Sequence, residues 1–231
     1  MSEGRDQILA ELRQALGRGP LDAARQAELD RRLEMPHPNL IPARARLDGA
    51  ARVELFCELA EASAATVARV ERVGDVPGAV ADYLAQQNLP PEAALAPDPG
   101  LDDIPWEARP LLTLRRGGTD GSDAVSVTGA YAAVAETGTL VMASAPGSPT
   151  LLNLLPETQI VVLRAGQVVG AYEEAIAQLR DAGGGAEDAG FMPRSVGFIT
   201  GPSRSGDIEQ TLQMGAHGPR RVHIIVVGDG S

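Results

Sequence analysis

Residues 196–227 read VGFITGPSRSGDIEQTLQMGAHGPRRVHIIVV, which is two apolar runs separated by two glycine-rich turns. The runs at 196–200 and 222–227 are rich in β-branched residues and are typical of strands. Between the turns, residues 207–214 carry apolar side chains one helical turn apart, which indicates a helix. We therefore predict a β-α-β unit in which the two strands are parallel neighbours.

Short apolar runs of the same kind recur through the chain and alternate with helical patterns. Several runs show little alternation between apolar and polar residues, as expected for strands that are covered on both faces. Strands that alternate with helices indicate a mostly parallel sheet, so the predicted class is α/β. The other predicted strands are residues 65–70, 111–114, 124–128, 139–143 and 160–163, and the clearest predicted helices are residues 77–87 and 172–179.

The N-terminal segment has a different pattern. Ile8, Leu12 and Leu16 recur at four-residue steps, which predicts a helix with one apolar face. We predict a helical arm over residues 1–47, followed by one α/β domain over residues 48–231.

The amino-acid inventory excludes several kinds of chemistry. All 20 basic residues are Arg, so neither a Schiff-base lysine nor a P-loop lysine is possible. Cys57 is the only cysteine, and the 3 His lack the close pairing that is typical of zinc sites. We therefore expect no metal and no iron–sulfur cluster to be bound by the chain's own Cys and His.

The net charge and the hydropathy limit the kinds of partner and the cellular location that we expect. A net charge of −11 argues against a nucleic-acid partner, which requires a basic surface. No apolar run approaches the length of a membrane span. The N-terminus, MSEGRDQILAELRQ, lacks the apolar core of a signal peptide. We expect a cytoplasmic protein.

The turn Gly-Pro-Ser-Arg-Ser-Gly at residues 201–206 is a candidate anion site. In a β-α-β unit this turn lies at the carboxyl edge of the sheet, beside the unpaired N–H groups of the helix. Gly201 would let a ligand approach the backbone, and Arg204 could grip a carboxylate or phosphate. The alternative is structural: Ser205 caps the helix, and Asp207 complements its dipole. Ser203 completes the candidate set.

A second turn lies in TGAYAAVAETGTLVMAS, residues 128–144, just before a predicted strand. Glu136 is a carboxylate at a strand edge that could act as a base or nucleophile. Its structural alternative is to accept hydrogen bonds from the turn itself. Thr137, Gly138 and Thr139 are the neighbouring candidates for ligand binding.

The segment GPSRS approaches the G-x-S-x-G motif of serine hydrolases, which need a histidine base. His217 is the nearest histidine in the sequence. A predicted helix separates it from Ser205, and the rise of that helix would place His217 roughly 18 Å from Ser205. We therefore set a hydrolase aside and keep His217 as a secondary candidate beside the end of that helix.

The stretches VTGAYAAVAETGTLVM and GPSRSGDIEQTLQMGAHGP together resemble the signature segments of the LUD domain family. The resemblance implies a Rossmann-like fold similar to the NagB/RpiA/CoA-transferase group. It also implies a role in oxidising L-lactate to pyruvate alongside iron–sulfur partner proteins, which would carry the clusters.

The leading hypothesis is a subunit of an L-lactate oxidation system that binds a small carboxylate or phosphate at the carboxyl edge of its sheet. The Glu136 turn would form one wall of the site and the Arg204 turn the other. One alternative is a non-catalytic assembly or regulatory subunit whose helical arm docks on the iron–sulfur partners. Another is a CoA-transferase-like or sugar-phosphate enzyme that uses Glu136. The oligomeric state stays open.

Overall fold

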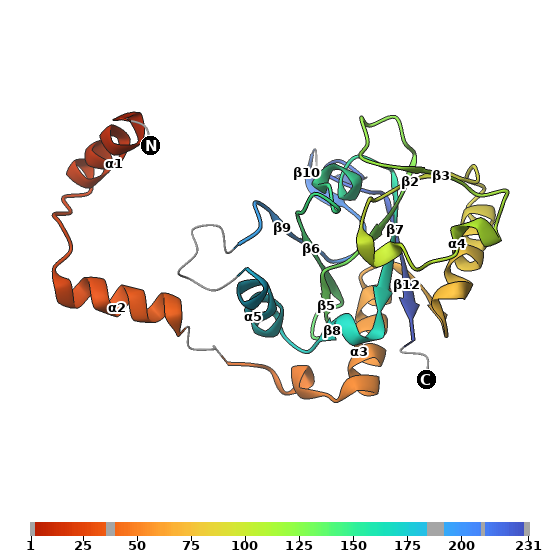
Figure 1. The fold of residues 1–231 in the computed structure, drawn as a ribbon, viewed down its shortest axis with the longest axis horizontal. Coiled ribbons are helices and arrows are strands. Elements are labelled where there is room, and N and C mark those ends of the chain that lie inside the picture. The colour runs from red at the N-terminus through yellow and green to blue at the C-terminus, as the bar shows by residue number, and fades with distance from the viewer. Residues whose placement is uncertain (1–2, 36–39, 184–191, 209–210, 229–231) are drawn as a thin grey trace. The chain divides into compact units, whose positions relative to one another are not determined.

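The structure is a computed structural model, and it describes residues 3–35, 40–183, 192–208 and 211–228 (Figure 1). The chain divides into two compact units, Met1–Asn39 and Leu40–Ser231. None of the helices in the described ranges combines the length and the apolarity that a bilayer-crossing segment needs.

The first unit ends at Asn39, inside the range 1–47 of the predicted helical arm. It contains α1 (Glu3–Ala15) and α2 (Ala23–Glu34), and Asp22 caps α2 by accepting a hydrogen bond from the Arg25 N–H. The apolar side chains that predicted α1 stay open to solvent: Ile8 is 60% exposed and Leu12 is 51% exposed. Helix formation in the arm therefore buries little apolar surface.

The second unit is built on a six-stranded sheet in which every pairing is parallel. In spatial order the strands are β1 (Thr66–Val70), β12 (Arg221–Val227), β7 (Thr158–Arg164), β4 (Val125–Gly129), β2 (Glu92–Leu95) and β3 (Thr113–Arg116). The central strands β4, β7 and β12 are almost fully buried. The predicted α/β class with a parallel sheet and N-terminal helices is confirmed.

A smaller, mixed sheet forms a second layer. Its strands, in spatial order, are β8 (Val168–Val169), β5 (Ala132–Val134), β6 (Thr139–Ala143) and β9 (Val196–Ile199). On β6, Leu140 and Met142 pack toward the six-stranded sheet, while Val141 packs toward α5 (Tyr172–Ala182). The period-two alternation of apolar side chains thus buries both faces of this sheet.

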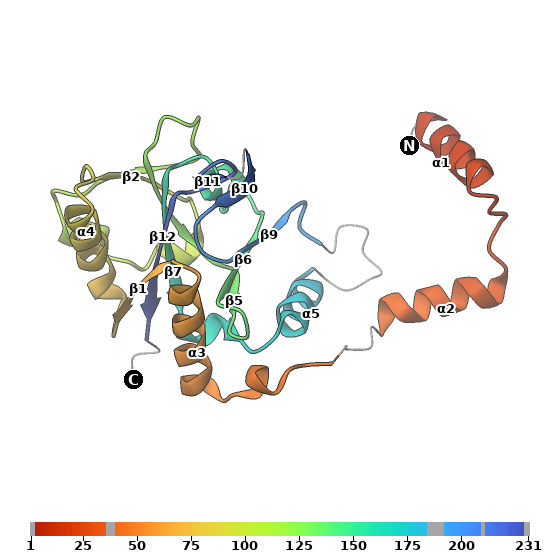
Figure 2. The same ribbon diagram turned by 180° about the vertical axis from the view of Figure 1, so that it is seen from behind.

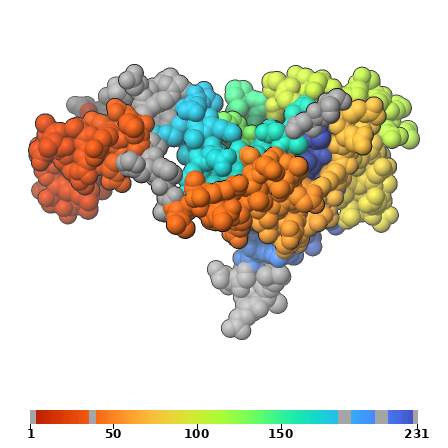
Figure 3. Space-filling model, turned by 90° about the horizontal axis from the view of Figure 1, so that it is seen from below, coloured from red at the N-terminus to blue at the C-terminus, as the bar shows by residue number. Residues whose placement is uncertain are grey.

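Two further helices cover the six-stranded sheet. Helix α4 (Val76–Gln86) starts with Pro77 in its first turn and buries Val80, Tyr83 and Leu84 on one face of the sheet. Helix α3 (Gly49–Ala62) buries Phe56 on the other face, beside the smaller sheet. In the space-filling view of Figure 3, the orange residues of α3 adjoin the segment that leads into α5. The Arg52 side chain on α3 donates to the Val168 carbonyl at 3.2 Å.

The predicted helix at residues 207–214 is wrong. This segment forms an antiparallel hairpin of β10 (Arg204–Ile208) and β11 (Thr211–Met214). The expected β-α-β unit is absent from residues 196–227 as described, because β9 belongs to the smaller sheet and β12 to the larger one. A segment this short gains little from helix formation by itself, so tertiary pairing decides its conformation.

The placement of the Arg204 turn at the carboxyl edge of the parallel sheet is also wrong. The Ser203 N–H donates to the Pro219 carbonyl at 2.9 Å, and Pro219 comes just before β12 begins. Gly201 lies against Ser63, just before β1 begins. Figure 2 shows the hairpin at the end of the sheet from which β12 starts, which is its amino edge.

Candidate functional site

The two motif turns meet at one rim of the smaller sheet. The Oγ1 atoms of Thr139 and Thr200 lie 2.7 Å apart, which joins the β5–β6 turn to the end of β9. The Thr137 Oγ1 lies 2.7 Å from the Thr139 Oγ1, and the Tyr172 hydroxyl lies 3.0 Å from each of these two atoms. These side chains form a hydroxyl cluster that ties β6, β9 and α5 together.

Glu136 lies beside this hydroxyl cluster and is 7% exposed. Its Oε1 accepts a hydrogen bond from the Tyr172 N–H at 3.4 Å, at the first residue of α5. A carboxylate at a helix N-terminus is stabilised by the helix dipole. This contact gives Glu136 a structural role, while its catalytic role stays a prediction.

The glycines of the two turns leave no room for a ligand on the side where a side chain would stand. Gly138 and Gly201 both have positive φ, 65° and 72°. A Cβ on Gly138 would lie 2.4 Å from the Ala60 nitrogen, and one on Gly201 would lie 2.0 Å from the Ser63 carbonyl oxygen. Both turns therefore pack directly on the last turn of α3.

Arg204 also contacts the end of α3. It is exposed, and its Nη2 donates to the Ser63 carbonyl at 3.3 Å. A cation is favourable beside the carbonyl end of a helix, whereas that end repels an anion. No helix N-terminus stands at this turn in the described residues, so the dipole argument for an anion site here is lost.

The distance argument that set His217 apart from Ser203 is wrong, because the intervening residues are not helical. The His217 N–H donates to the Ser203 Oγ at 3.3 Å. The contact comes from the backbone, and the His217 side chain is exposed. Ser205 pairs with Gln213 across the hairpin. Asp207 lies on β10, and its side chain is outside the part of the chain that the structure describes.

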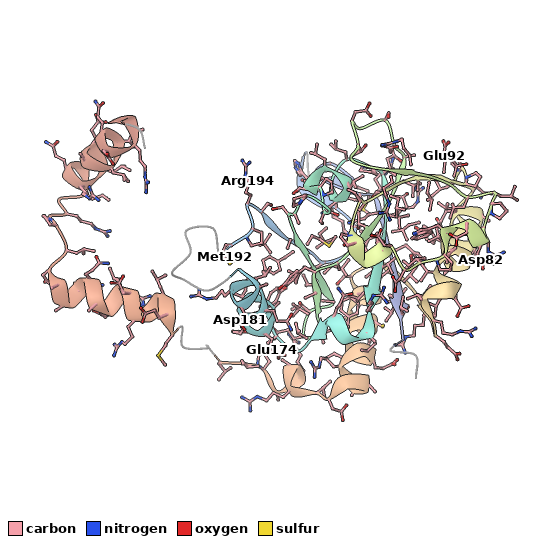
Figure 4. All side chains as sticks on the ribbon, in the orientation of Figure 1. Asp82, Glu92, Glu174, Asp181, Met192 and Arg194 are labelled. Carbon is pink, nitrogen blue, oxygen red and sulfur yellow. The ribbon has the colours of Figure 1, made fainter. Side chains whose placement is uncertain are left out.

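A cavity of about 590 Å³ lies elsewhere, at the carboxyl edge of the six-stranded sheet. Asp98, Gly129 and Arg164 line it, and they stand at or just beyond the ends of β2, β4 and β7. The opposite wall includes Leu179 on α5 and Met192, which Figure 4 labels. In open parallel sheets this edge is where ligands bind, and the volume lies within the roughly 300–1,000 Å³ of typical ligand sites.

Arg164 is the one cationic side chain among the described residues that line this carboxyl-edge cavity. Its Nη2 donates to the Asp103 carboxylate at 2.7 Å and to the Gly100 carbonyl at 3.1 Å, which holds the side chain in place. In the described part of the chain, Nε and Nη1 donate to no protein group. The guanidinium can therefore offer these donors to an anion.

Hydroxyl groups complete the polar part of the cavity. The Ser144 Oγ accepts the Ser195 N–H at 2.9 Å, so its own O–H can donate to a ligand. Burial, and then the nearby charge of Asp181, raise the pKa of Tyr131. The Tyr131 hydroxyl therefore keeps its proton at neutral pH and can also donate.

The cavity combines polar and apolar groups. Arg164, Ser144 and Tyr131 offer donors, the Asp98 carboxylate offers an acceptor, and Leu101, Val162 and Leu179 give the cavity an apolar part. Nowhere in the described part of the chain do three or more His, Cys, Asp or Glu side chains gather in a group that could hold a metal ion.

The sequence carries a signal for this cavity in two residues that follow or end strands. Asp98 lies in the turn Pro-Asp-Pro-Gly directly after β2, and Arg164 is the last residue of β7. Polar residues at the carboxyl ends of parallel strands are the usual binding positions of such folds. β2 is a short, largely buried strand, and it brings the Asp98 turn to this edge of the sheet.

Comparison with known proteins identifies a domain and several relatives. Residues 121–227 match the sequence model of the LUD domain. Lactate utilization protein C of Geobacillus sp. (strain WCH70) is 35% identical over 105 residues, which cover 46% of this chain and 42% of that relative. The chain thus spans less than half the length of that relative. Lactate utilization protein C of Geobacillus thermodenitrificans (strain NG80-2) is 27% identical over 239 residues, covering 98% of this chain and 97% of the relative.

A solved structure supports the fold. The crystal structure of a DUF162 family protein from Deinococcus radiodurans superposes with a TM-score of 0.56 and 23% sequence identity. The match covers 79% of this chain and 99% of that chain. Similarity at this level shows a shared fold and does not extend to the ligand.

Proposed function

The chain carries a LUD domain, as its two motif stretches predicted, and from this premise we propose that it is a subunit of a lactate-utilisation system. In this proposal the subunit acts in the oxidation of L-lactate to pyruvate together with iron–sulfur partner proteins. It binds a small carboxylate, of the kind of lactate or pyruvate, in the carboxyl-edge cavity.

The observation that carries the proposal is Arg164 at the end of β7, with guanidinium donors that no described protein group uses. Asp103 fixes the side chain, so little conformational entropy is lost when a carboxylate binds. The motif turns offer a less suitable place, because they pack on the carbonyl end of α3.

The electrons of lactate oxidation require an acceptor. With Cys57 as its only cysteine, the chain cannot supply the four thiolates that hold a common iron–sulfur cluster. The proposal therefore assigns the clusters to the partner proteins and the binding of the organic acid to this subunit.

We predict that Arg164→Ala weakens the binding of L-lactate about ten- to a hundredfold, because a charge-assisted hydrogen bond to a carboxylate contributes about 1.5–3 kcal/mol. Isothermal titration calorimetry with the full chain measures this effect. Arg204→Ala is the matched control: it also removes one guanidinium, but from the motif turn, and it should leave the affinity unchanged.

The reverse result would refute the choice of site. If Arg204→Ala removes binding while Arg164→Ala keeps it, the ligand binds at the motif turns. Binding by neither the unchanged chain nor any variant would remove the carboxylate from the proposal.

An assembly role is a second candidate, and the arm favours it. Helix α1 keeps Ile8 and Leu12 exposed, and Leu16, directly after the end of the helix, is 62% exposed. An apolar stripe at helical spacing is the usual surface with which a helix docks into a partner's groove.

For this second candidate, we predict that replacing both Ile8 and Leu12 with Asp releases iron–sulfur proteins from the tagged full chain in a pull-down from lactate-grown cells. L-lactate binding should persist, because the carboxyl-edge cavity is untouched. Gln14→Asp adds a charge to the same helix without removing an apolar side chain, and it should retain the partners. Retention by the double variant would remove the arm from assembly.

A further inference from the structure

We propose that Asp98 makes the carboxyl-edge cavity select 2-hydroxy acids over the corresponding 2-oxo acids. The inference rests on the proposed function, since it concerns the same cavity and the same class of ligand. It assigns Asp98 to the hydroxyl group of the ligand and leaves the carboxylate to Arg164.

The two oxygens of the Asp98 carboxylate have different surroundings. Oδ1 accepts the Gly100 N–H at 2.8 Å, which fixes the orientation of the carboxylate. Oδ2 faces Gly129 at the end of β4 and accepts no hydrogen bond from any group in the described ranges. Asp98 and Gly129 both line the cavity, so the unused oxygen is available to a ligand there.

Two glycines make room for this arrangement. A Cβ on Gly129 would lie 2.5 Å from the Asp98 Oδ2, so any side chain there would displace the carboxylate. A Cβ on Gly147 would lie 3.0 Å from the Pro97 carbonyl oxygen and 3.3 Å from the Asp98 Cα. The chain therefore holds the Asp98 turn from two sides with residues that have no side chain.

Asp98 and Arg164 are linked through one residue. Gly100 donates its N–H to Asp98 and accepts the Arg164 Nη2 on its carbonyl at 3.1 Å. Asp98 and Arg164 also line the same cavity. A three-carbon 2-hydroxy acid carries its carboxylate and its hydroxyl on adjacent carbons, and in the proposal these two groups bind Arg164 and Asp98.

The chemistry of Asp98 discriminates between the two forms of the acid. An ionised carboxylate is only an acceptor, so it binds the O–H of a hydroxy acid and repels the oxygen of an oxo acid. Sites that hydrogen-bond a substrate hydroxyl reject analogues that lack it. The cavity should therefore hold lactate more tightly than pyruvate.

The test is calorimetric titration of the full chain with L-lactate and, separately, with pyruvate. In Asp98→Asn, the Gly100 N–H still needs an acceptor and takes the amide oxygen, so the NH₂ group replaces Oδ2 and donates. We expect L-lactate to bind about tenfold or more weakly to this variant, with pyruvate affinity unchanged or raised. Asp102→Asn, which removes the charge of an acid paired with Arg116, is the matched control and should not alter the preference.

The outcomes separate the inference from the proposed function. Equal loss of both ligands in Asp98→Asn, or no loss of either, overturns the role of Asp98 while lactate binding stands. If the unchanged chain binds neither acid, both proposals fail. Gly129→Ala is a second variant, which keeps the Asp98 charge but would push the carboxylate aside. It should also lower the preference for L-lactate over pyruvate, so the test does not depend on the folding of Asp98→Asn alone.

Discussion

Replacing Gly201 with alanine is expected to destabilise the protein by about 3 kcal/mol or more. Gly201 has a φ of 72°, a conformation that costs other residues about 1–2 kcal/mol. The added Cβ would also lie 2.0 Å from the Ser63 carbonyl oxygen. Because Ser63 is the C-cap residue of α3 and its backbone cannot move as a side chain does, the turn or the helix must shift.

Urea unfolding followed by circular dichroism measures this loss. Gly74→Ala is the matched control, since a Cβ at Gly74 would meet nothing within 4 Å. Its free energy of unfolding should change by no more than about 0.5 kcal/mol. If Gly201→Ala were equally harmless, the packing of the motif turn on α3 would be wrong.

Acidification is expected to destabilise the unchanged protein by about 3 kcal/mol more than it destabilises His223→Phe. His223 is 5% exposed, stacks on Tyr83 with ring centroids 3.9 Å apart, and places its Nδ1 2.8 Å from the Thr66 Oγ1. Its Nε2 has no hydrogen-bond partner in the described residues. Burial is the main cause that lowers the pKa of His223 from 6.5 to about 4.

The direction of this pH effect follows from proton binding. Between pH 6.5 and about 4, the unfolded chain binds a proton at His223 that the folded chain refuses. Stability therefore rises with pH across this window: the contribution is full above 6.5 and is lost as the pH falls toward 4.

Urea titrations of both proteins between pH 7 and 4 test the His223 prediction. Phe keeps a flat ring against Tyr83 but cannot titrate, and the carboxylates titrate alike in both proteins. Parallel pH profiles would mean that His223 is not held neutral by burial.

The fold could be predicted from the sequence wherever a local pattern agreed with its tertiary environment. β6 matches its predicted bounds, and β4, β7, β9 and β12 differ by a few residues at most. β4, β6, β7 and β12 are buried along almost their whole length, so short runs with little alternation revealed them.

The sequence misled us where the same spacing suits two structures. Ile208 and Leu212 stand four residues apart, which fits a helix face, but the segment forms a hairpin. The choice between helix and hairpin depends on strand pairing and on the packing of Gly201 against the end of α3. These contacts join residues far apart in the sequence, so the spacing of apolar residues does not reveal them.

The candidate site shows the same division. That the two motif turns meet could be expected from a shared domain, and the contact between Thr139 and Thr200 joins them. The turns lie at the amino edge of the parallel sheet because β9 belongs to the smaller sheet. No local sequence pattern indicates to which sheet β9 belongs. Asp98 and Arg164 stand at the opposite edge of that sheet, so the position of the motif turns does not point to them.

The most direct test of the account is a crystal structure of the full chain grown with L-lactate. The account places the ligand carboxylate within hydrogen-bonding distance of the Arg164 guanidinium, with its hydroxyl directed to the Asp98 Oδ2. A lactate molecule bound instead between the Glu136 and Arg204 turns, with the carboxyl-edge cavity empty, would contradict it.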